Sequence, residues 1–327
     1  MDTENRDHLL SAIKWLSLRK VPPTRAAILH TEFVTKWDKG EQLLDSELNG
    51  LVASGLAVRS DGVYSLTPDG RRLAQQNAAR EFGAWMIACE KSAAYRELCR
   101  RLYGSERCQF NMMTQAQLEK LLDPLNVSTC QSILDVGCGT GALTEYIADH
   151  SNGKITGMDF SSDAIQFAQE RTREKRDRLS FQVVDMDEIA FPANSFDAIV
   201  SIDTLYFVKD LHKTMSAMRH SLQRHGQMGI FFSPKISTGE SKDMLLPENT
   251  ALAKALETCG MQFETWDFTL EEMEMWKKSM DIASELKDQF AGEGNLAIYE
   301  DRISEATREL EFFNTERKRR YMYRAWL

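Results

Sequence analysis

The stretch ILDVGCGTGALTEYIA, residues 133–148, has three glycines, at positions 137, 139 and 141, between an apolar run and an amphipathic run. A glycine-rich turn between a strand and a helix predicts a ligand site at the end of the strand. A triphosphate-binding loop has the pattern Gly-x4-Gly-Lys-Ser/Thr. Here Gly141 is followed by Ala142 and Leu143, so no lysine stands where a phosphate needs one. The triphosphate interpretation is therefore excluded.

A dinucleotide-binding loop has the pattern Gly-x-Gly-x-x-Gly, in which the third glycine lets the helix pack closely on the strand. In this chain the third glycine comes one position early, and Ala142 stands where it is expected. This departure is mild. A nicotinamide dinucleotide therefore remains an alternative ligand at this point.

Alternating strand and helix patterns surround the loop and must position it. Strands are expected within residues 132–136, 154–161, 180–188, 196–208, 226–233, 249–269 and 319–327, with helical patterns between most of them. Strands that alternate with helices predict an α/β fold with a doubly wound, mostly parallel, seven-stranded sheet. Ligands of such sheets bind at the carboxyl ends of the strands, which is where the glycine loop lies.

The run Asp135-Val136-Gly137-Cys138-Gly139-Thr140-Gly141 resembles the first motif of the class I S-adenosylmethionine-dependent methyltransferases, which have a Rossmann-like fold. The resemblance implies that the glycines admit the methionine part of the cofactor, whose carboxylate meets the N–H groups of the next helix. It also implies that Asp135 faces the cationic amino group and sulfonium. The loop residues assigned to the cofactor are Asp135, Gly137, Cys138, Gly139 and Gly141.

Later motifs follow in the order of that family, over about residues 130–235. Asp159 matches the acid that accepts both ribose hydroxyls, since a carboxylate offers two acceptor oxygens to a diol. Asp185 matches the residue that binds the adenine amine, with the backbone N–H of Met186 for the ring nitrogen. Phe160 and Met186 are expected to flank the adenine, and Ser201 to line the cofactor.

The segment 196–208, FDAIVSIDTLYFV, resembles the fourth-strand signature of the family, whose end faces both ligands. Tyr206 and Asp203 are the candidate catalytic residues, because either could remove a proton from the acceptor. Tyr206 is also a candidate substrate contact. His212 is a weaker candidate, expected on an exposed helix face.

Residues 1–80 form a predicted module of three helices and a two-stranded hairpin, which turns at Asp61-Gly62 and resembles a winged helix. The helix that would enter a DNA groove, 41–56, has Glu41, Asp45 and Glu47 but no Lys or Arg. Binding to phosphates needs cations there. We therefore expect the module to shape a substrate pocket or to form a homodimer.

Two additions to the sheet are expected to select the substrate. Residues 81–125 form a predicted helical connector or cap, in which Tyr95, Tyr103 and Phe110 are candidate substrate contacts, although aromatics at helical spacing also suit a core. A helical insertion is expected at about 270–318, inside the cofactor domain 126–327. The basic run TERKRRYMYR after it is expected either to hold an anionic group or to form a solvated helix end.

Composition limits the remaining possibilities. The chain has 327 residues, six cysteines without a CxxC pair, and a formal net charge of −9. The acidic balance argues against nucleic-acid binding, and no apolar run approaches the ~20 residues of a membrane span. We expect a cytoplasmic enzyme with reduced thiols and no metal, which methylates a small molecule by in-line displacement. An NAD(P)-dependent oxidoreductase and a ligand-sensing winged-helix regulator are the alternatives.

Overall fold

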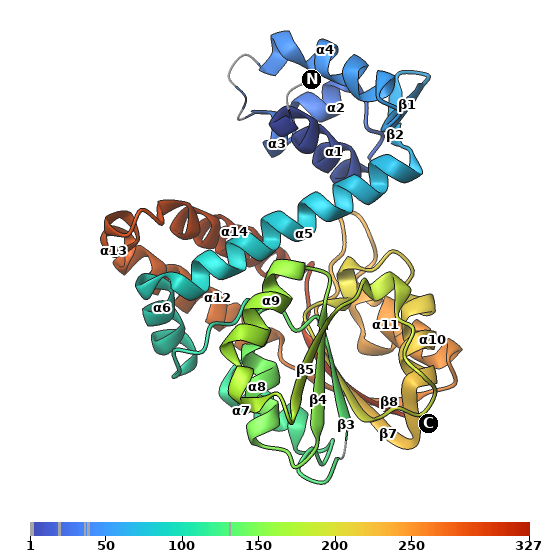
Figure 1. Cartoon of the computed structure of the whole chain (residues 1–327), viewed down its shortest axis with the longest axis vertical. Coiled ribbons are helices and arrows are strands. Elements are labelled where there is room, and N and C mark those ends of the chain that lie inside the picture. The colour runs from blue at the N-terminus through green and yellow to red at the C-terminus, as the bar shows by residue number, and fades with distance from the viewer. Residues whose placement is uncertain (1–2, 19–20, 36, 38–39, 131) are drawn as a thin grey trace. The chain divides into compact units, whose positions relative to one another are not determined.

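The computed structural model describes residues 3–18, 21–35, 37, 40–130 and 132–327 (Figure 1). The chain divides into two compact units, residues 1–82 and 83–327. The boundary lies inside one helix, α5 (Pro68–Lys91), whose first part belongs to unit 1 and whose last part belongs to unit 2. Within the described residues, no helix is long and apolar enough to span a membrane.

Unit 1 packs short helices against a two-stranded hairpin. The helices are α1 (Thr3–Leu18), α2 (Arg25–Leu29), α3 (Glu32–Thr35) and α4 (Gly40–Ala53), and the antiparallel strands are β1 (Ala57–Ser60) and β2 (Val63–Leu66). Thr24 caps α2 by accepting a hydrogen bond from the Ala27 N–H. Asp61 and Gly62 both have positive φ, which closes the hairpin turn. The core includes Leu9, Leu10, Ile13, Leu44, Leu48 and Leu51.

Unit 2 contains the expected seven-stranded sheet (Figure 1). Its strands are β3 (Ser132–Val136), β4 (Lys154–Asp159), β5 (Leu179–Val183), β6 (Phe196–Ile202), β7 (Leu222–Phe232), β8 (Gln262–Asp267) and β9 (Tyr321–Trp326). They lie in the order β5-β4-β3-β6-β7-β9-β8, and β9 is antiparallel to both of its neighbours. The prediction of a mostly parallel sheet is confirmed. The strand order reverses beside β3, so the crevice for a ligand is expected where β3 and β6 end.

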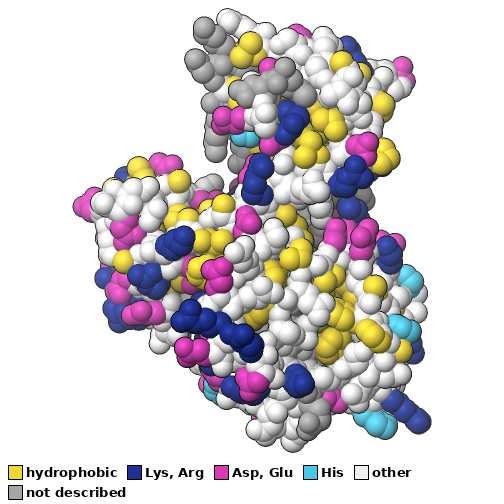
Figure 2. Space-filling model, in the orientation of Figure 1, with side chains coloured by type: hydrophobic (Ala, Val, Ile, Leu, Met, Phe, Trp, Pro, Cys, Tyr) yellow, Lys and Arg dark blue, Asp and Glu magenta, His cyan; other side chains and the backbone are white. Residues whose placement is uncertain are grey.

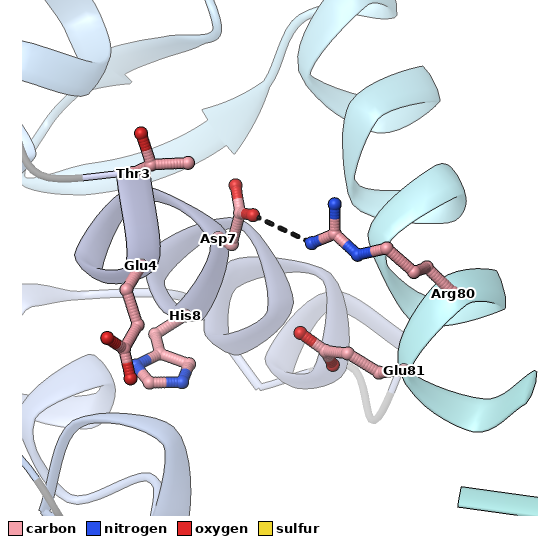
Figure 3. A pocket seen from close by; sticks show the side chains of 6 residues that line it. All are labelled: Thr3, Glu4, Asp7, His8, Arg80 and Glu81. Atoms are coloured by element: carbon pink, nitrogen blue, oxygen red, sulfur yellow. Dashed lines mark hydrogen bonds and ion pairs between the residues drawn. The ribbon is translucent and has the colours of Figure 1, made fainter. Parts of the chain in front are cut away.

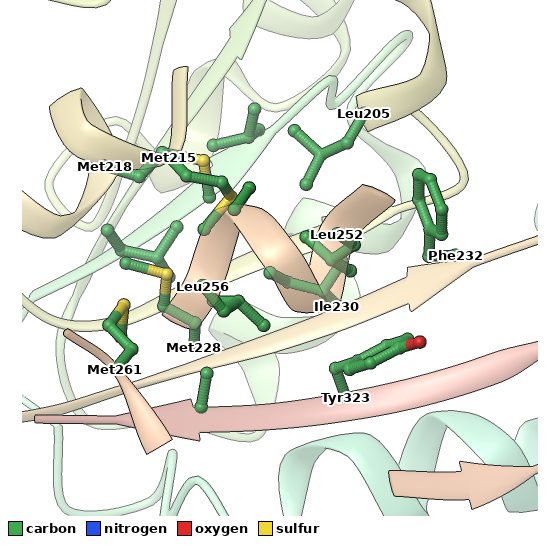
Figure 4. Packing of buried hydrophobic residues seen from close by; sticks show 14 of the residues in the cluster. Leu205, Met215, Met218, Met228, Ile230, Phe232, Leu252, Leu256, Met261 and Tyr323 are labelled. Carbon is green, nitrogen blue, oxygen red and sulfur yellow. The ribbon is translucent and has the colours of Figure 1, made fainter. Parts of the chain in front are cut away.

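Helices cover both faces of the sheet. On one face, Met215 and Met218 of α10 (Leu211–Ser221) and Leu252 and Leu256 of α11 (Ala251–Thr258) pack on strand residues such as Ile230 (Figure 4). The other face packs against α7 (Gln115–Leu122), α8 (Ala142–Asp149) and α9 (Ser162–Arg171). Short 3₁₀ turns complete the connections: Arg173–Lys175, Met186–Glu188, Leu205–Phe207, Lys242–Leu245 and Pro247–Asn249.

A helical subdomain joins the connector to the insertion. Helix α6 (Ala93–Tyr103) shares an apolar core with α12 (Thr269–Glu285), α13 (Lys287–Gly292) and α14 (Leu296–Asn314). The helical insertion expected at about 270–318 thus consists of three helices, and the last of them ends at Asn314. The antiparallel insertion of β9 brings the end of α14 back to the carboxyl edge of the sheet.

Tyr95 and Tyr103 belong to the core of this subdomain. They are 1% and 8% exposed, and their hydroxyls donate to the backbone carbonyls of Gln109 and Asn111. Phe110 stacks on Tyr95, with 5.9 Å between the ring centroids. These aromatics therefore hold the connector to the insertion. Both hydroxyls have backbone partners, and a substrate contact of Tyr95, Tyr103 or Phe110 stays a prediction.

Candidate functional site

The glycine loop leaves the end of β3 and turns beside β4. The N–H groups of Gly137 and Cys138 both donate to the Met158 carbonyl, at 2.8 and 2.9 Å. Gly137 has φ of +80°, and a Cβ there would lie 2.3 Å from the Cγ2 atom of Thr204. Thr204 follows β6, so glycine is required at 137 for the ends of β3 and β6 to pack this closely. Cys138 has a thiol whose pKa is raised by burial, so it lies in the loop as a neutral side chain.

Asp135 lies at the end of β3 and is 3% exposed. Its Oδ2 accepts a hydrogen bond from the Thr144 hydroxyl on α8, at 2.7 Å. Burial raises the pKa of this carboxyl to about 6, against the lowering effect of Thr144. A buried carboxylate that has one neutral hydroxyl for a partner would be stabilised by a cationic ligand group. Thr144 itself was not predicted from the sequence.

Asp159 ends β4 and is 6% exposed. Its two oxygens accept hydrogen bonds from the N–H groups of Gly139 and Ser161, each at 3.0 Å. Burial raises the pKa of the carboxyl, while these N–H groups lower it. Each oxygen has a second lone pair, so the carboxylate retains the capacity to accept two hydroxyl groups. Through its hydrogen bonds with Gly139 and Ser161, Asp159 also links the glycine loop to the turn that follows β4.

Helix α8 begins at Gly141, and no side chain caps its first turn. By contrast, Ser161 caps α9, Asp210 caps α10 and Thr250 caps α11. The first N–H groups of a helix attract anions, particularly where no side chain satisfies them. The start of α8 thus offers an anionic group a place beside the buried Asp135.

The residues predicted to hold a purine lie just beyond the ends of β4 and β5. Asp185 follows β5, and its Oδ1 accepts a hydrogen bond from the Asp187 N–H at 3.0 Å, which caps a 3₁₀ turn. Phe160 and Met186 are both half-buried, after β4 and in that turn respectively. All three residues follow the carboxyl ends of neighbouring strands. Whether they contact a ligand stays a prediction.

The turn after β6 is held against the glycine loop. The hydroxyls of Ser201 and Thr204 both donate to the Val136 carbonyl, at 3.3 and 3.1 Å. Asp203 lies between them with φ of +57°, and its carboxylate forms two hydrogen bonds with the Arg320 guanidinium. Burial raises the pKa of the Asp203 carboxyl, against the lowering effect of Arg320. Both carboxylate oxygens are nevertheless occupied by Arg320, so Asp203 is held in a buried ion pair.

Tyr206 lies on the exposed side of this turn. Tyr206 is 44% exposed, and its ring centroid lies 6.0 Å from that of Phe232 at the end of β7. It is therefore accessible at the carboxyl edge, and its catalytic role stays a prediction. His212 is exposed on α10, as expected.

Three residues of α5 at helical spacing contact the loops of the site. Gly83 packs against Ser161, Met86 lies beside Gly139, and the Glu90 carboxylate accepts a hydrogen bond from the Thr140 hydroxyl at 2.6 Å. The spacing i, i+3, i+7 places all three on one face of the helix. The sequence analysis missed this contact. A glycine within a long helical pattern was the available signal, since it often marks close packing.

The basic run before β9 is not a solvated helix end. Lys318 is 3% exposed and Arg320 is 1% exposed, and both form buried ion pairs with carboxylates. Arg324, within β9, pairs with Glu264 at a more exposed position. The described residues contain no group of three or more His, Cys, Asp or Glu side chains that could hold a metal ion.

The residues at this edge fit a zwitterionic nucleoside such as S-adenosylmethionine. The buried carboxylate of Asp135 suits an ammonium group, and the uncapped start of α8 suits a carboxylate. The Asp159 carboxylate can accept the two hydroxyls of a diol. The acid at the end of β4 also suits a nicotinamide dinucleotide. The loop pattern and the second acid, Asp135, favour the methyl donor.

Comparisons with known proteins agree with this assignment. Residues 133–226 match the family model of a methyltransferase domain. The phosphoethanolamine N-methyltransferase 1 of Arabidopsis thaliana is 27% identical over 203 residues, which is 59% of this chain and 41% of that enzyme. The chain therefore spans about two fifths of the length of that relative.

Solved structures share the fold. The phosphoethanolamine N-methyltransferase 2 of Haemonchus contortus, solved with S-adenosyl-L-methionine, superposes with a TM-score of 0.62 at 18% identity, over 81% of this chain and 62% of that one. The [4+2]-cyclase SpnF superposes with a TM-score of 0.57 at 16% identity, over 74% of this chain and 94% of that one.

The contact of α5 with the site generates a prediction. Replacing a helical glycine by alanine normally stabilises a helix by about 1 kcal/mol. In Gly83→Ala, however, the new Cβ would lie 2.1 Å from the Ser161 Oγ, which caps α9. We expect the free energy of unfolding of unit 2 to fall by about 1–3 kcal/mol, as measured by denaturant unfolding.

Gly292→Ala is the matched control, because Gly292 is also helical and its Cβ would meet open space. It should leave stability unchanged or raise it. The double variant Gly83→Ala/Ser161→Ala should recover part of the loss. A stabilising Gly83→Ala would show that α5 does not pack on the loop after β4.

The matched segment 133–226 begins with β3 and contains the glycine loop, Asp159, Asp185 and the turn after β6. The motif order, the seven-stranded sheet and the donor and acceptor groups at its edge agree with one another. Residues 133–226 therefore match a methyltransferase domain in sequence, and the sheet around them has the fold of the solved methyltransferase structures.

Proposed function

We propose that this protein transfers the methyl group of S-adenosylmethionine to a small-molecule acceptor. The observation that supports this most directly is the pair of buried carboxylates, Asp135 and Asp159, at the ends of two adjacent strands on either side of a glycine loop. Asp135 suits the ammonium group of S-adenosylmethionine, and Asp159 suits its ribose hydroxyls. No cation pairs with either carboxylate among the described residues, so a cationic ligand gains from binding there.

Each residue of the edge has a proposed task. Asp159 would accept the ribose hydroxyls, Asp135 would face the ammonium group, and the first N–H groups of α8 would hold the carboxylate. Asp185 and Met186 would bind the adenine, with Phe160 beside it. The backbone of Gly137, Cys138, Gly139 and Gly141 would face the methionine part, and Ser201 would support the loop through the Val136 carbonyl.

The bound cofactor supplies a methyl group that its sulfonium already activates. The protein must align an acceptor atom in line with that methyl and exclude water. We propose Tyr206 as the residue that contacts the acceptor, because it is exposed beside the Thr204 turn. Asp203 would position that turn rather than remove a proton.

The charges at this edge also limit the acceptor. Buried cations here already have carboxylate partners: Arg320 pairs with Asp203, and Lys318 pairs with Glu272 and Glu309. A phosphate held by Arg320 or Lys318 would have to displace one of these partners. We therefore propose an acceptor without a phosphate group, in contrast to the phosphoethanolamine named for the relatives.

Unit 1 would be a winged-helix-like module that shapes the substrate pocket or forms a homodimer. In α4, Asp45 pairs with Arg25, and Glu41 is exposed, which does not suit a DNA groove. A recess of about 340 Å³ in this unit is lined by Thr3, Glu4, Asp7, His8, Arg80 and Glu81 (Figure 3). Figure 2 shows charges of both signs interspersed over the visible face. The regulator hypothesis therefore remains the weaker alternative.

Cofactor titration distinguishes the three hypotheses. Calorimetry should show binding of S-adenosylmethionine and S-adenosylhomocysteine but not of NADH. In Asp159→Asn, affinity should fall about 10–100-fold, because two charge-assisted hydrogen bonds are weakened. Asp177→Asn, an exposed acid of the same unit, should bind like the wild type. NADH binding would support the oxidoreductase, and retardation of defined DNA at moderate salt would support the regulator.

Activity is tested by mass spectrometry of metabolite extracts incubated with the protein and S-adenosylmethionine. We expect a small molecule to gain the mass of one methyl group. Phosphoethanolamine, included as a defined acceptor, should stay unmodified. Its methylation would overturn the proposal on the acceptor but not that on methyl transfer.

The buried Asp135 predicts a pH dependence. Its pKa in the folded protein, about 6, lies above the ordinary value. Above about pH 6 the carboxyl is therefore ionised in the folded protein, and its burial lowers the free energy of unfolding. A cationic ligand needs the ionised form. Affinity for S-adenosylhomocysteine should therefore fall about tenfold from pH 7 to about pH 5, as Asp135 takes up a proton.

Asp135→Asn separates these effects. The amide can still accept the Thr144 hydrogen bond, so we expect weaker binding at pH 7 with a flatter pH profile. The unfolding free energy of the ligand-free variant at pH 7 should be about 1–3 kcal/mol higher, since a buried charge is removed. A profile as steep as that of the wild type would assign the titration to another group.

A further inference from the structure

Six side chains of alternating charge form a continuous network at the carboxyl edge of the sheet. Asp203 pairs with Arg320 at 2.7 Å, Arg320 lies 3.5 Å from Glu272, and Glu272 pairs with Lys318 at 2.5 Å. Lys318 also pairs with Glu309 at 2.7 Å. At the end of the network, Glu309 pairs with Lys235 at 2.6 Å and lies 3.9 Å from the exposed Arg308, which is outside the buried network. Three negative and three positive charges thus alternate.

The network is buried along most of its length. The side chains of Arg320, Lys318 and Glu272 are 1%, 3% and 3% exposed, and only the terminal Lys235 approaches solvent. Burial raises the pKa of Glu272, but the charges of Lys318 and Arg320 outweigh it and bring the value to about 2. Glu272 also accepts hydrogen bonds from Trp276 and Ser233. Every charge of the network therefore has at least one opposite charge beside it.

One end of the network holds the turn that supports the cofactor loop. Asp203 has φ of +57°, a conformation that costs free energy for a residue other than glycine. Both of its oxygens accept hydrogen bonds from the planar Arg320 guanidinium, which forms a bidentate pair with the carboxylate. The next residue, Thr204, packs on Gly137 and donates to the Val136 carbonyl. A displaced Asp203 would therefore displace the Thr204 contact with the glycine loop.

The other members of the network belong to the helical insertion and its return. Glu272 lies in the first turn of α12, and Glu309 lies in α14. Arg320 and Lys318 immediately precede β9, and Lys235 follows β7. One set of ion pairs thus links both long helices of the insertion to the turn after β6.

We propose that Arg320 is a positioning residue, which keeps the 203–206 turn packed on the cofactor loop and fixes the α12–α14 insertion to the same edge. The acceptor pocket and the methyl donor would then keep a constant relative position. The proposal rests on the methyltransferase function proposed above. It goes beyond that function because it makes cofactor affinity depend on a residue that lies 183 positions after Gly137 and outside the family motifs.

The test removes the inner ion pair while it preserves the charge balance. In Asp203→Asn/Arg320→Gln, we expect S-adenosylhomocysteine affinity, measured by calorimetry, to fall at least tenfold. Amide hydrogen exchange of residues 203–207 should accelerate in the same variant. Glu264→Gln/Arg324→Gln is the control, because it removes another Arg–Glu pair that joins β9 to β8. It should change neither measurement, whatever its effect on stability.

A second variant keeps the proposal testable if the double variant does not fold. Arg320→Lys retains the charge but loses the paired geometry, so it should also bind S-adenosylhomocysteine less tightly and exchange faster at 203–207. Wild-type affinity in a folded Arg320→Lys or Asp203→Asn/Arg320→Gln protein, with only a lower melting temperature, would overturn the positioning role. Absence of binding in the wild type would instead overturn the proposed function.

Discussion

The contact between the ends of β3 and β6 determines the rest of the site. A single carbonyl, that of Val136, accepts hydrogen bonds from the hydroxyls of both Ser201 and Thr204. The contact is possible only because position 137 has no Cβ. Once these two strand ends are fixed together, the glycine loop, the start of α8 and the turn with Tyr206 take their places along one edge of the sheet.

The electrostatics of that edge separate two kinds of buried acid. Asp135 and Asp159 are satisfied by a hydroxyl and by backbone N–H groups, and burial raises the pKa of both. Glu272 and Glu309 are instead paired with cations, which lower the pKa of both against the effect of burial. The first kind gains from a positive ligand, whereas the second is already neutralised within the protein. We thus propose binding for the first kind of carboxylate and support for the second.

The sheet, the place of the glycine loop and the places of the acids at the strand ends could be predicted because they follow from local patterns. Alternating strands and helices, the glycine spacing and the acids that end β3 and β4 are all contained in short segments. The ion pairs could not be predicted, because Asp203 and Arg320 are 117 residues apart in sequence and meet through the antiparallel return of β9. The packing of the α6 aromatic residues could not be predicted for a related reason: helical spacing does not reveal that α12 and α14 cover them.

The alternating network has a consequence for how this sequence can vary. Because the six charges sum to zero in a buried setting, loss of any one of the inner charges leaves an uncompensated partner. Viable changes should therefore occur in concert, with an acid and a base exchanged or neutralised together at positions far apart in the chain. In diverged sequences with the same buried network, we expect positions 203 and 320, or positions 272 and 318, to change together.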